Sequence, residues 1–292
     1  MPPDDRTIAR TLEWLGASPA ALPRWIFPVA PDLAARLVIH RFATPRRLPR
    51  RGPPLPHPST LDIDGARVAV YTQGQGTPVL LVHGWEGSAH DMATLAGALA
   101  AAGFRAVAID LPAHGRSAGR RLTLPDAGRV VRRAAERIGP LAAVVGHSLG
   151  AAAVLLALRD GLRARCGVAL APPRRVEPFL EQFARSLGVG RRHDAALRRA
   201  LEARVGPLDD LDADRVARAI RRPGLVVHDR GDRVIPLSDA SAVAHAWPGA
   251  RLVATEGLGH RRILHDETVA RHVARFVLHS TSGAATPRGA FR

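Results

Sequence analysis

The sequence predicts an α/β fold in which a mostly parallel central sheet carries helices on both faces. Several apolar runs are continuous rather than alternating, which is typical of strands buried on both sides. Helical patterns lie between these runs, and one alternating segment with a turn signal precedes them. A hairpin followed by repeated strand–helix units favours a mostly parallel sheet covered on both sides.

Residues 1–58 are predicted to form a helical extension and a linker. Two short amphipathic stretches, at about 8–15 and 32–42, are separated by prolines, and Asp32 after Pro31 is a typical helix start. The stretch "TPRRLPRRGPPLPHPST" follows and is too rich in proline and arginine to pack as a helix or strand. We therefore expect an extended linker or a surface strap there.

Residues 59–279 are predicted to form the main domain. It opens with "LDIDGARVAV", in which Asp64-Gly65 is a strong hairpin signal. Strands are expected at 79–82, 106–109, 142–145, 166–170, 224–227 and 250–254, and helices at about 90–102, 123–138, 149–160, 238–247 and 265–278. The arginine-rich segment 172–223 has helical periodicity and is predicted to be an insertion between two strands. The tail, residues 280–292, is predicted to be disordered.

The charge of the chain favours no particular partner. The formal net charge is +16, which invites a nucleic-acid interpretation. All 42 basic residues are arginine, however, and they are spread along the chain with few aromatics between them. This pattern is typical of a GC-rich genome, and it provides no stacking platform for single strands. We expect no specific nucleic-acid binding.

The sequence predicts a cytoplasmic protein without a membrane span. No apolar run approaches the roughly 18 residues that a spanning helix needs, and the first residues carry acids instead of an apolar signal segment. Cys166 is the one cysteine and lies in an apolar strand-like run, so it reads as a buried small hydrophobe. The oligomeric state cannot be predicted from these features.

The stretch "VVGHSLGAA" provides the candidate nucleophile. It places Ser148 in a Gly-x-Ser-x-Gly pattern between a strand pattern and a helix pattern. In such a tight turn the serine has a strained backbone and projects from the carboxyl edge of the sheet, and glycines at Gly146 and Gly150 avoid collisions. The helix that begins there also directs free N–H groups at whatever the hydroxyl attacks.

A serine nucleophile needs a base, and the base needs an orienting carboxylate. In this topology the acid and then the histidine follow the serine along the chain. "LVVHDRGDRVIP" supplies Asp229 or Asp232, and we favour Asp232 because it follows Gly231 on a loop that can reach across, whereas Asp229 could cap local N–H groups. "LVATEGLGHRRIL" supplies the base.

The base is assigned to His260. It stands in the glycine-bounded loop "GLGH", whereas His265 is expected at the start of the last helix and partly exposed. His147 is next to the serine, but its ring is expected to turn away from the hydroxyl and pack.

Acyl transfer also needs donors for the developing oxyanion. The backbone N–H of Leu149, directly after the serine, should supply one, and the N–H of Trp85 in "LVHGWEG" the other. The Trp85 side chain could wall the acyl pocket or only fill space. Glu86 is unusual here because its carboxylate would oppose the forming charge, so we expect it to point away, toward an arginine.

No metal or organic cofactor is predicted. His83, His90 and Asp91 are close in sequence but lack the spacing of paired metal ligands.

The segments "VHGWEGSAHD", "AIDLPAHGRSAG", "VVGHSLGAA", "DRGDRVIP" and "EGLGHRRIL" together resemble the α/β-hydrolase superfamily, in particular bacterial serine hydrolases. The resemblance runs from about residue 61 to 278. It implies a Ser148–His260–Asp232 triad, Trp85 and Leu149 as oxyanion amides, and a cap over the active site at 172–223. The chain departs from the family at Glu86, where glycine is common, and in "PAHG", where "PGHG" is usual.

The same resemblance implies framework roles for Asp110 and His114. The expected activity is cleavage of a carboxylic ester of a small or medium-sized acyl substrate, without a cofactor. Thioesterase, lactonase, C–C hydrolase and acyltransferase activities are compatible with the same triad. A serine at this position argues against the dehalogenase and epoxide-hydrolase variants, whose counterparts carry aspartate. The non-enzyme alternative is an inactive binding module with this fold.

Overall fold

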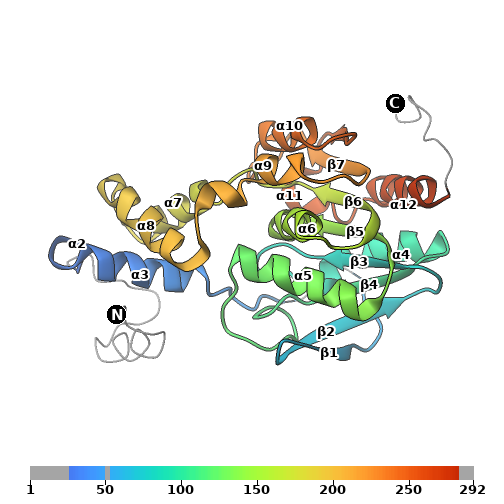
Figure 1. The fold of residues 1–292 in the computed structure, drawn as a ribbon, viewed down its shortest axis with the longest axis horizontal. Coiled ribbons are helices and arrows are strands. Elements are labelled where there is room, and N and C mark those ends of the chain that lie inside the picture. Colours follow the sequence, from blue (N-terminus) through green and yellow to red (C-terminus); the bar gives the residue numbers. More distant parts are fainter. Residues whose placement is uncertain (1–25, 50–52, 283–292) are drawn as a thin grey trace. The chain divides into compact units, whose positions relative to one another are not determined.

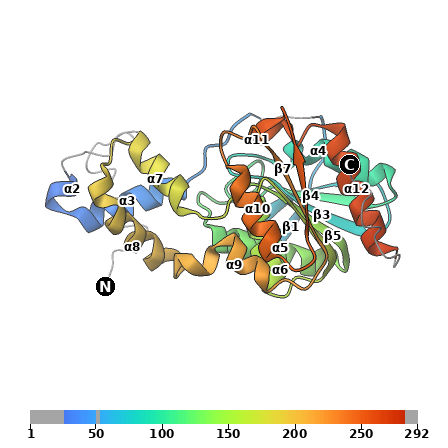
Figure 2. The same cartoon turned by 90° about the horizontal axis from the view of Figure 1, so that it is seen from above.

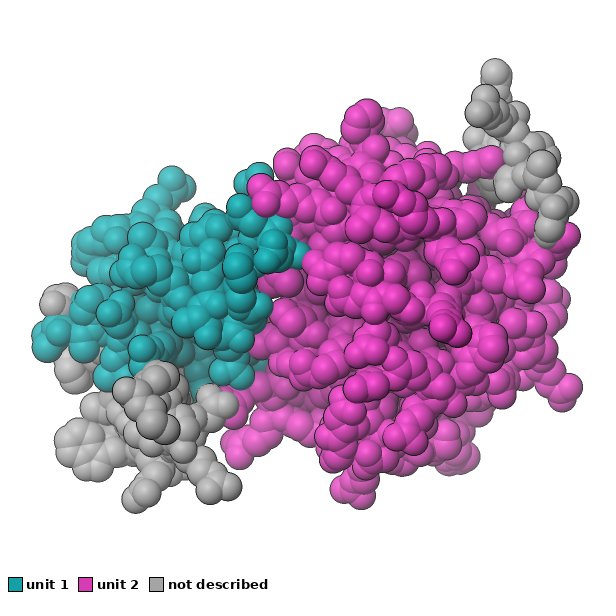
Figure 3. All heavy atoms as spheres, viewed as in Figure 1, with its two compact units in different colours: residues 1–44, 175–210 teal, residues 45–174, 211–292 magenta. Residues whose placement is uncertain are grey.

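The computed structural model describes residues 26–49 and 53–282. The amphipathic stretch predicted at 8–15 and the residues of the predicted tail beyond 282 lie outside the described residues. The chain divides into two compact units, drawn in two colours in Figure 3. Unit 1 is Met1–Thr44 with Arg175–Asp210, and unit 2 is Pro45–Arg174 with Leu211–Arg292.

After the N-terminal helices come three successive strands, and from β3 on strands are separated by helical segments. In chain order they are α2 (Ile26–Val29), α3 (Pro31–Phe42), β1 (Ser59–Ile63), β2 (Ala66–Gln73), β3 (Pro78–Val82), η1 (Ala89–Met92), α4 (Ala93–Ala101), β4 (Arg105–Ile109), α5 (Leu124–Ile138), β5 (Leu141–His147), α6 (Leu149–Arg159), β6 (Ala164–Leu170), α7 (Glu177–Ser186), η2 (Arg191–His193), α8 (Asp194–Val205), η3 (Leu208–Leu211), α9 (Ala213–Arg218), β7 (Gly224–Asp229), α10 (Leu237–Ala246), β8 (Arg251–Thr255), α11 (Gly259–Arg262) and α12 (Glu267–Thr281).

Unit 2 is built on one sheet, which has eight strands within the described residues, in the order β1-β2-β4-β3-β5-β6-β7-β8. The β1–β2 and β2–β4 pairs are antiparallel, and all other neighbours are parallel (Figure 1). The predicted fold class is therefore confirmed. The carboxyl ends of β3, β5, β7 and β8 meet at one edge of the sheet, which is where ligands bind in open α/β sheets.

Two hydrophobic layers enclose the central strands. In β3, Leu80 and Val82 pack in the layer that contains α5 and α6, whereas Val79 and Leu81 pack in the layer that contains α4 and α12. All four side chains are fully buried. The two views in Figures 1 and 2 show the helices on opposite faces of this sheet. Burial on both faces explains why the central strands are continuous apolar runs.

Local sequence signals set the boundaries of several elements. The hairpin turn between β1 and β2 places Asp64 and Gly65 at φ of 51° and 81°, the left-handed conformations that a tight hairpin requires. Helix α5 begins with a capping box in which Thr123 and Asp126 bond each other's backbone N–H groups. Helix α12 begins where the Asp266 side chain accepts from the N–H of Val269.

Four details differ from the sequence-based expectations. Strand β8 is half exposed instead of buried on both faces, with Leu252 39% exposed, because it is the edge strand of the sheet. The histidine segment 259–262 forms the short helix α11 instead of a loop, and His265 precedes α12 instead of starting it. Helix α12 continues to Thr281, into the segment predicted as disordered.

The segment 172–223 is divided between the units. Helices α7 and α8 cluster with α3 in unit 1, whereas α9 packs in the core of unit 2. Within unit 1, α3 buries Leu37 and Val38 and α8 buries Leu197 and Leu201, and the Phe42 and Phe183 rings lie 5.6 Å apart. The cap role of this segment stays a prediction.

Across residues 26–49 and 53–282, none of the helices combines the length and the apolar composition that a membrane crossing would need.

Candidate active site

Ser148 occupies the turn between β5 and α6 with a strained backbone, φ 53° and ψ −120°. A Cβ on Gly146 would lie 2.3 Å from the carbonyl oxygen of Gly150, and a Cβ on Gly150 would lie 2.4 Å from the carbonyl oxygens of Val82 and His83. Only hydrogen atoms fit at these two positions, so β5, α6 and the end of β3 pack tightly around the serine. The strand–turn–helix context expected from the sequence is present.

The structure brings together Ser148, His260 and Asp232. His260 Nε2 lies 3.2 Å from Ser148 Oγ, and His260 Nδ1 lies 2.8 Å from Asp232 Oδ2. The ionised carboxylate can only accept, so the Nδ1–H donates to it and the Nε2 lone pair faces the serine hydroxyl. This is the tautomer in which an imidazole can take a proton from serine. The His260 side chain is 11% exposed and Asp232 is fully buried.

Asp232 is held as a carboxylate. Its Oδ1 accepts hydrogen bonds from the backbone N–H groups of Val234 and Ile235, at 2.8 and 3.0 Å. Burial alone would raise the pKa of Asp232, but the hydrogen bond from His260 and those from the two backbone N–H groups lower it below its usual range. The nearby His228 Nε2 lies 2.9 Å from the carbonyl oxygen of Ile235, to which it donates, and 3.5 Å from Asp232 Oδ2.

Asp229, the other candidate acid, shapes the loop that presents His260. Its carboxylate accepts from the N–H of Gly231 at 2.9 Å, the hydroxyl of Thr255 at 2.8 Å and the N–H of Leu258 at 2.9 Å. Burial opposes ionisation, but hydrogen bonds led by the backbone N–H of Gly259 lower the pKa of Asp229. The structure therefore places Asp232, and not Asp229, against the imidazole.

His147 has a contact that sequence reasoning missed. Its Nε2 lies 2.9 Å from the carbonyl oxygen of His260, to which it donates a hydrogen bond. Burial, aided by the neighbouring His260, lowers the pKa of His147 to about 3, so the ring is neutral. The sequence predicts only that the His147 ring packs. The one sequence signal for its contact with His260 is the position of His147 next to the nucleophile. His265 is exposed and lies outside the group.

The loop that carries Trp85 runs beside the serine. A Cβ on Gly84 would lie 3.0 Å from Ser148 Cβ, so the backbone leading into Trp85 is in close contact with the nucleophile. His83 fixes this turn: its Nδ1–H donates to the carbonyl of Gly84 at 2.7 Å, and its Nε2 accepts from the N–H of Leu111 at 3.0 Å. Burial lowers the pKa of His83, which keeps this donor–acceptor pattern.

Leu149 is the first residue of α6, directly after the serine. The oxyanion roles of the Trp85 and Leu149 amides stay predictions. The Trp85 ring packs edge-on against His114, with ring centroids 5.3 Å apart.

The expected arginine partner of Glu86 is found: Arg46 Nε and Nη2 lie 2.9 and 2.8 Å from its two carboxylate oxygens.

Asp110 and the residues near it have structural partners. Asp110 accepts from the N–H groups of Ala89 and Arg116, at 2.7 and 2.8 Å, and the Tyr71 hydroxyl lies 3.3 Å from it. Asp91 accepts from the N–H of Ser88 at 2.8 Å. These bonds hold the loops that follow β3 and β4.

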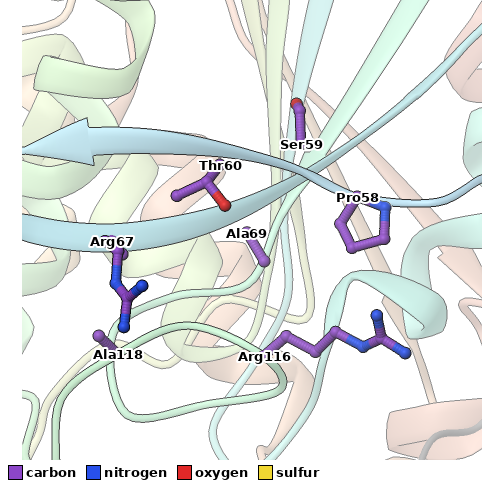
Figure 4. Close-up of a pocket in the computed structure, with 7 residues that line it drawn as sticks. All are labelled: Pro58, Ser59, Thr60, Arg67, Ala69, Arg116 and Ala118. Atoms are coloured by element: carbon purple, nitrogen blue, oxygen red, sulfur yellow. The ribbon is translucent and has the colours of Figure 1, made fainter.

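An open cavity of about 370 Å³ lies over the β1–β2 hairpin (Figure 4). Its lining comes from β1, β2 and the loop after β4, namely Pro58, Ser59, Thr60, Arg67, Ala69, Arg116 and Ala118. None of the three grouped side chains lines it, so it is separate from the candidate site.

Comparisons with known proteins show the family of this chain. The profile of the Alpha/beta hydrolase family matches residues 79–272, which is more than half of the chain. The chain therefore belongs to the Alpha/beta hydrolase family. A stretch of 118 residues is 34% identical to a protein of Mycobacterium phage D29 that is provisionally described as a non-heme haloperoxidase. The match covers 39% of this chain and 42% of that relative, less than half of its length.

Solved structures share the fold at low identity. The structure of Est1E from Butyrivibrio proteoclasticus with ferulic acid bound is 19% identical with a TM-score of 0.62, over 77% of this chain and 99% of that one. An esterase of Pyrococcus furiosus is 21% identical with a TM-score of 0.61, over 81% of this chain and 98% of that one. The esterase RhEst1 of a Rhodococcus species is 20% identical with a TM-score of 0.58, over 75% and 97%.

Proposed function

We propose that this protein is a serine hydrolase that cleaves carboxylic esters of small or medium-sized acyl substrates through an acyl-enzyme intermediate. The observation that carries the proposal is the pair of contacts that joins Ser148 Oγ to His260 at 3.2 Å and His260 to Asp232 at 2.8 Å. A buried carboxylate, an oriented imidazole and a serine on a strained turn have no simpler structural reason to converge.

In the first half-reaction His260 Nε2 takes the proton of Ser148 as Oγ attacks the ester carbonyl carbon. The amides of Trp85 and Leu149 donate to the oxyanion, and the imidazolium is stabilised by Asp232. Collapse of the tetrahedral intermediate breaks the bond to the alcohol, which leaves with the proton from His260.

In the second half-reaction water replaces the alcohol. His260 removes a proton from the water, the hydroxide attacks the acyl carbon, and Ser148 leaves with the proton, so that the carboxylic acid is released. His147 holds the backbone carbonyl of His260 throughout, which keeps the imidazole on the nucleophile. Apart from the ester and water, each step uses only groups of the chain.

The test is the hydrolysis of p-nitrophenyl esters of increasing acyl length. We expect a preferred chain length, a fall in kcat of at least about 10³-fold in Ser148→Ala and His260→Ala, and a smaller loss in Asp232→Asn. The matched control is His265→Ala, which removes a neighbouring histidine that the site does not include. Equal activity in Ser148→Ala and wild type, or no hydrolysis at any chain length, would contradict the proposal.

A further inference from the structure

The strap, residues 45–49, joins the end of α3 to the sheet domain in sequence and forms neither helix nor strand. It carries two consecutive arginines, Arg46 and Arg47, and each of them bonds to a different loop at the carboxyl edge of the sheet. A solvated linker would leave both guanidinium groups in water. The strap is therefore a bound part of unit 2.

Arg46 bonds Glu86 through three separate contacts. The guanidinium Nε and Nη2 donate to Oε1 and Oε2 at 2.9 and 2.8 Å, and the backbone N–H of Arg46 donates to Oε1 at 3.1 Å. The Glu86 side chain is 13% exposed, whereas the Arg46 side chain is 66% exposed. Arg46 is therefore the main group that neutralises this carboxylate, with a smaller contribution from Arg261, because little water reaches it.

Glu86 follows Trp85 directly, and its own φ is 55°. This positive φ belongs to the same turn that brings the backbone beside Ser148, so the main chain of Glu86 is held near the nucleophile. The carbonyl of Gly84 accepts from the N–H of Gly87 at 3.1 Å, which closes the turn. A net negative charge at Glu86 would lie close to the oxyanion that the Trp85 amide is proposed to bind.

Arg47 holds the loop on the other side. It donates to the carbonyl oxygens of Gly115, Ser117 and Gly119, the last two at 2.7 and 3.3 Å. This loop also contains His114, whose ring packs against Trp85. The two arginines of the strap thus tie together the two loops whose side chains meet at Trp85.

We infer that Arg46 is a positioning residue for oxyanion formation: its fork neutralises Glu86 beside the turn that presents the Trp85 amide. The inference rests on the proposed hydrolase function. Glu86 directly follows Trp85, and the strap supplies the cation that makes this glutamate compatible with a developing negative charge. Arg46 acts on the reaction through Glu86 and touches no reacting atom.

The first test is a double-mutant cycle on the hydrolysis of a p-nitrophenyl ester. Arg46→Ala should lower kcat about tenfold and change KM less than about twofold, because an unpaired charge opposes the transition state more than the substrate. Glu86→Gln alone should stay close to wild type. The double variant Arg46→Ala/Glu86→Gln should recover most of the lost kcat, and Arg46→Lys should be intermediate, because lysine keeps the charge without the fork.

A pH series separates the effect of the Glu86 charge from a loss of loop structure in Arg46→Ala. Glu86 is faced by Arg46, by Arg261 and by His114, and burial alone would raise its pKa once Arg46 is removed. The ratio of wild-type to Arg46→Ala kcat should therefore shrink as the pH falls and Glu86 takes up a proton. In the Glu86→Gln background the same ratio should not depend on pH.

The matched control is Arg129→Ala, which breaks an exposed arginine–aspartate pair on α5, 2.7 Å long, and should leave kcat unchanged. An Arg46→Ala variant with wild-type kcat would overturn the inference, as would a loss that Glu86→Gln does not restore. Should Arg46→Ala not fold, Arg46→Lys and the double variant carry the comparison. A wild type without Ser148-dependent hydrolysis would overturn this inference and the proposed function together, whereas an active wild type with a failed cycle overturns the inference alone.

Discussion

Gly150 shows how strongly single positions are constrained around the nucleophile. It lies in the first turn of α6 with a φ outside the left-handed region, so alanine would be acceptable to the backbone there. The restriction comes from space, because a Cβ would lie 2.4 Å from two backbone carbonyl oxygens at the end of β3. Backbone atoms cannot rotate away as a flexible side chain can.

Gly150→Ala should therefore destabilise the protein by about 2 kcal/mol or more and reduce hydrolysis, because α6 must shift away from β3. Gly190→Ala is the matched control: its φ is −74° and a new Cβ would meet nothing within 4 Å. The measurement is urea unfolding of both variants. If the two midpoints coincide, the packing described around Ser148 is wrong.

The candidate residues could be found from the sequence because the motif spacing restricts them. Ser148 follows from its two glycines, and His260 and Asp232 follow from their places after the last two strands. The partners of His147 and Glu86 could not be assigned this way. Each depends on a contact with a distant segment, His260 in one case and Arg46 in the other, which no local pattern specifies.

At the scale of elements, the α5 capping box is the clearest local determinant. The Thr123 Oγ1 accepts from the N–H of Asp126 at 3.3 Å, and the Asp126 carboxylate accepts from the N–H and the hydroxyl of Thr123 at 3.3 and 2.6 Å. These bonds satisfy donors that the helix itself leaves without partners.

Thr123→Ala should lower the free energy of unfolding by about 1 kcal/mol, which is the usual cost of losing a cap. Asp126→Ala should cost a similar amount, and the double variant less than the sum, because the two side chains share their hydrogen bonds. Chemical denaturation of the three variants measures this. Strictly additive losses would show that the two residues do not act as one cap.

The apolar periodicity predicted which segments are helices and strands, but it did not predict which strand lies at the edge of the sheet and which lie at its centre. Strand β8 has an apolar centre between Arg251 and Thr255, and it is half exposed because it lies at the end of the strand order. The short helix α11 begins after Leu258, whose N–H donates to the distant Asp229 carboxylate. Tertiary contacts decided both features.

At the scale of the whole molecule, buried neutral histidines link stability to pH. Burial lowers the pKa of His114 and of His147 to about 3, well below the value near 6.5 in an unfolded chain. The unfolded state therefore binds more protons than the native state between about pH 6.5 and pH 3. This contribution to stability is complete above pH 6.5 and is lost as the pH falls through that window.

We expect the free energy of unfolding to be nearly level above pH 7 and to fall below pH 6.5, by about 1.4 kcal/mol per pH unit for each buried histidine. The lowered pKa values of Asp229 and Asp232 add to the loss below about pH 4. Urea unfolding between pH 8 and pH 5 tests this, with His114→Gln expected to show a shallower slope. A stability that rises on acidification would contradict the burial of these histidines.

The division into two units was beyond sequence reasoning. In unit 1, α3 packs with α7 and α8, which are more than a hundred residues away along the chain. No pattern in either segment predicts this contact. The sheet domain, by contrast, follows from consecutive strand–helix repeats whose order restricts the topology. Its membership in the Alpha/beta hydrolase family extends over most of that domain.

The most direct measurement of the central claim is the mass of the intact protein after reaction with a fluorophosphonate, followed by peptide mapping. We expect one adduct per chain on Ser148, formed at a rate that drops sharply in His260→Ala and absent in Ser148→Ala. A properly folded wild type that gains no mass, or gains it on another residue, would show that the three converging side chains do not make a nucleophile.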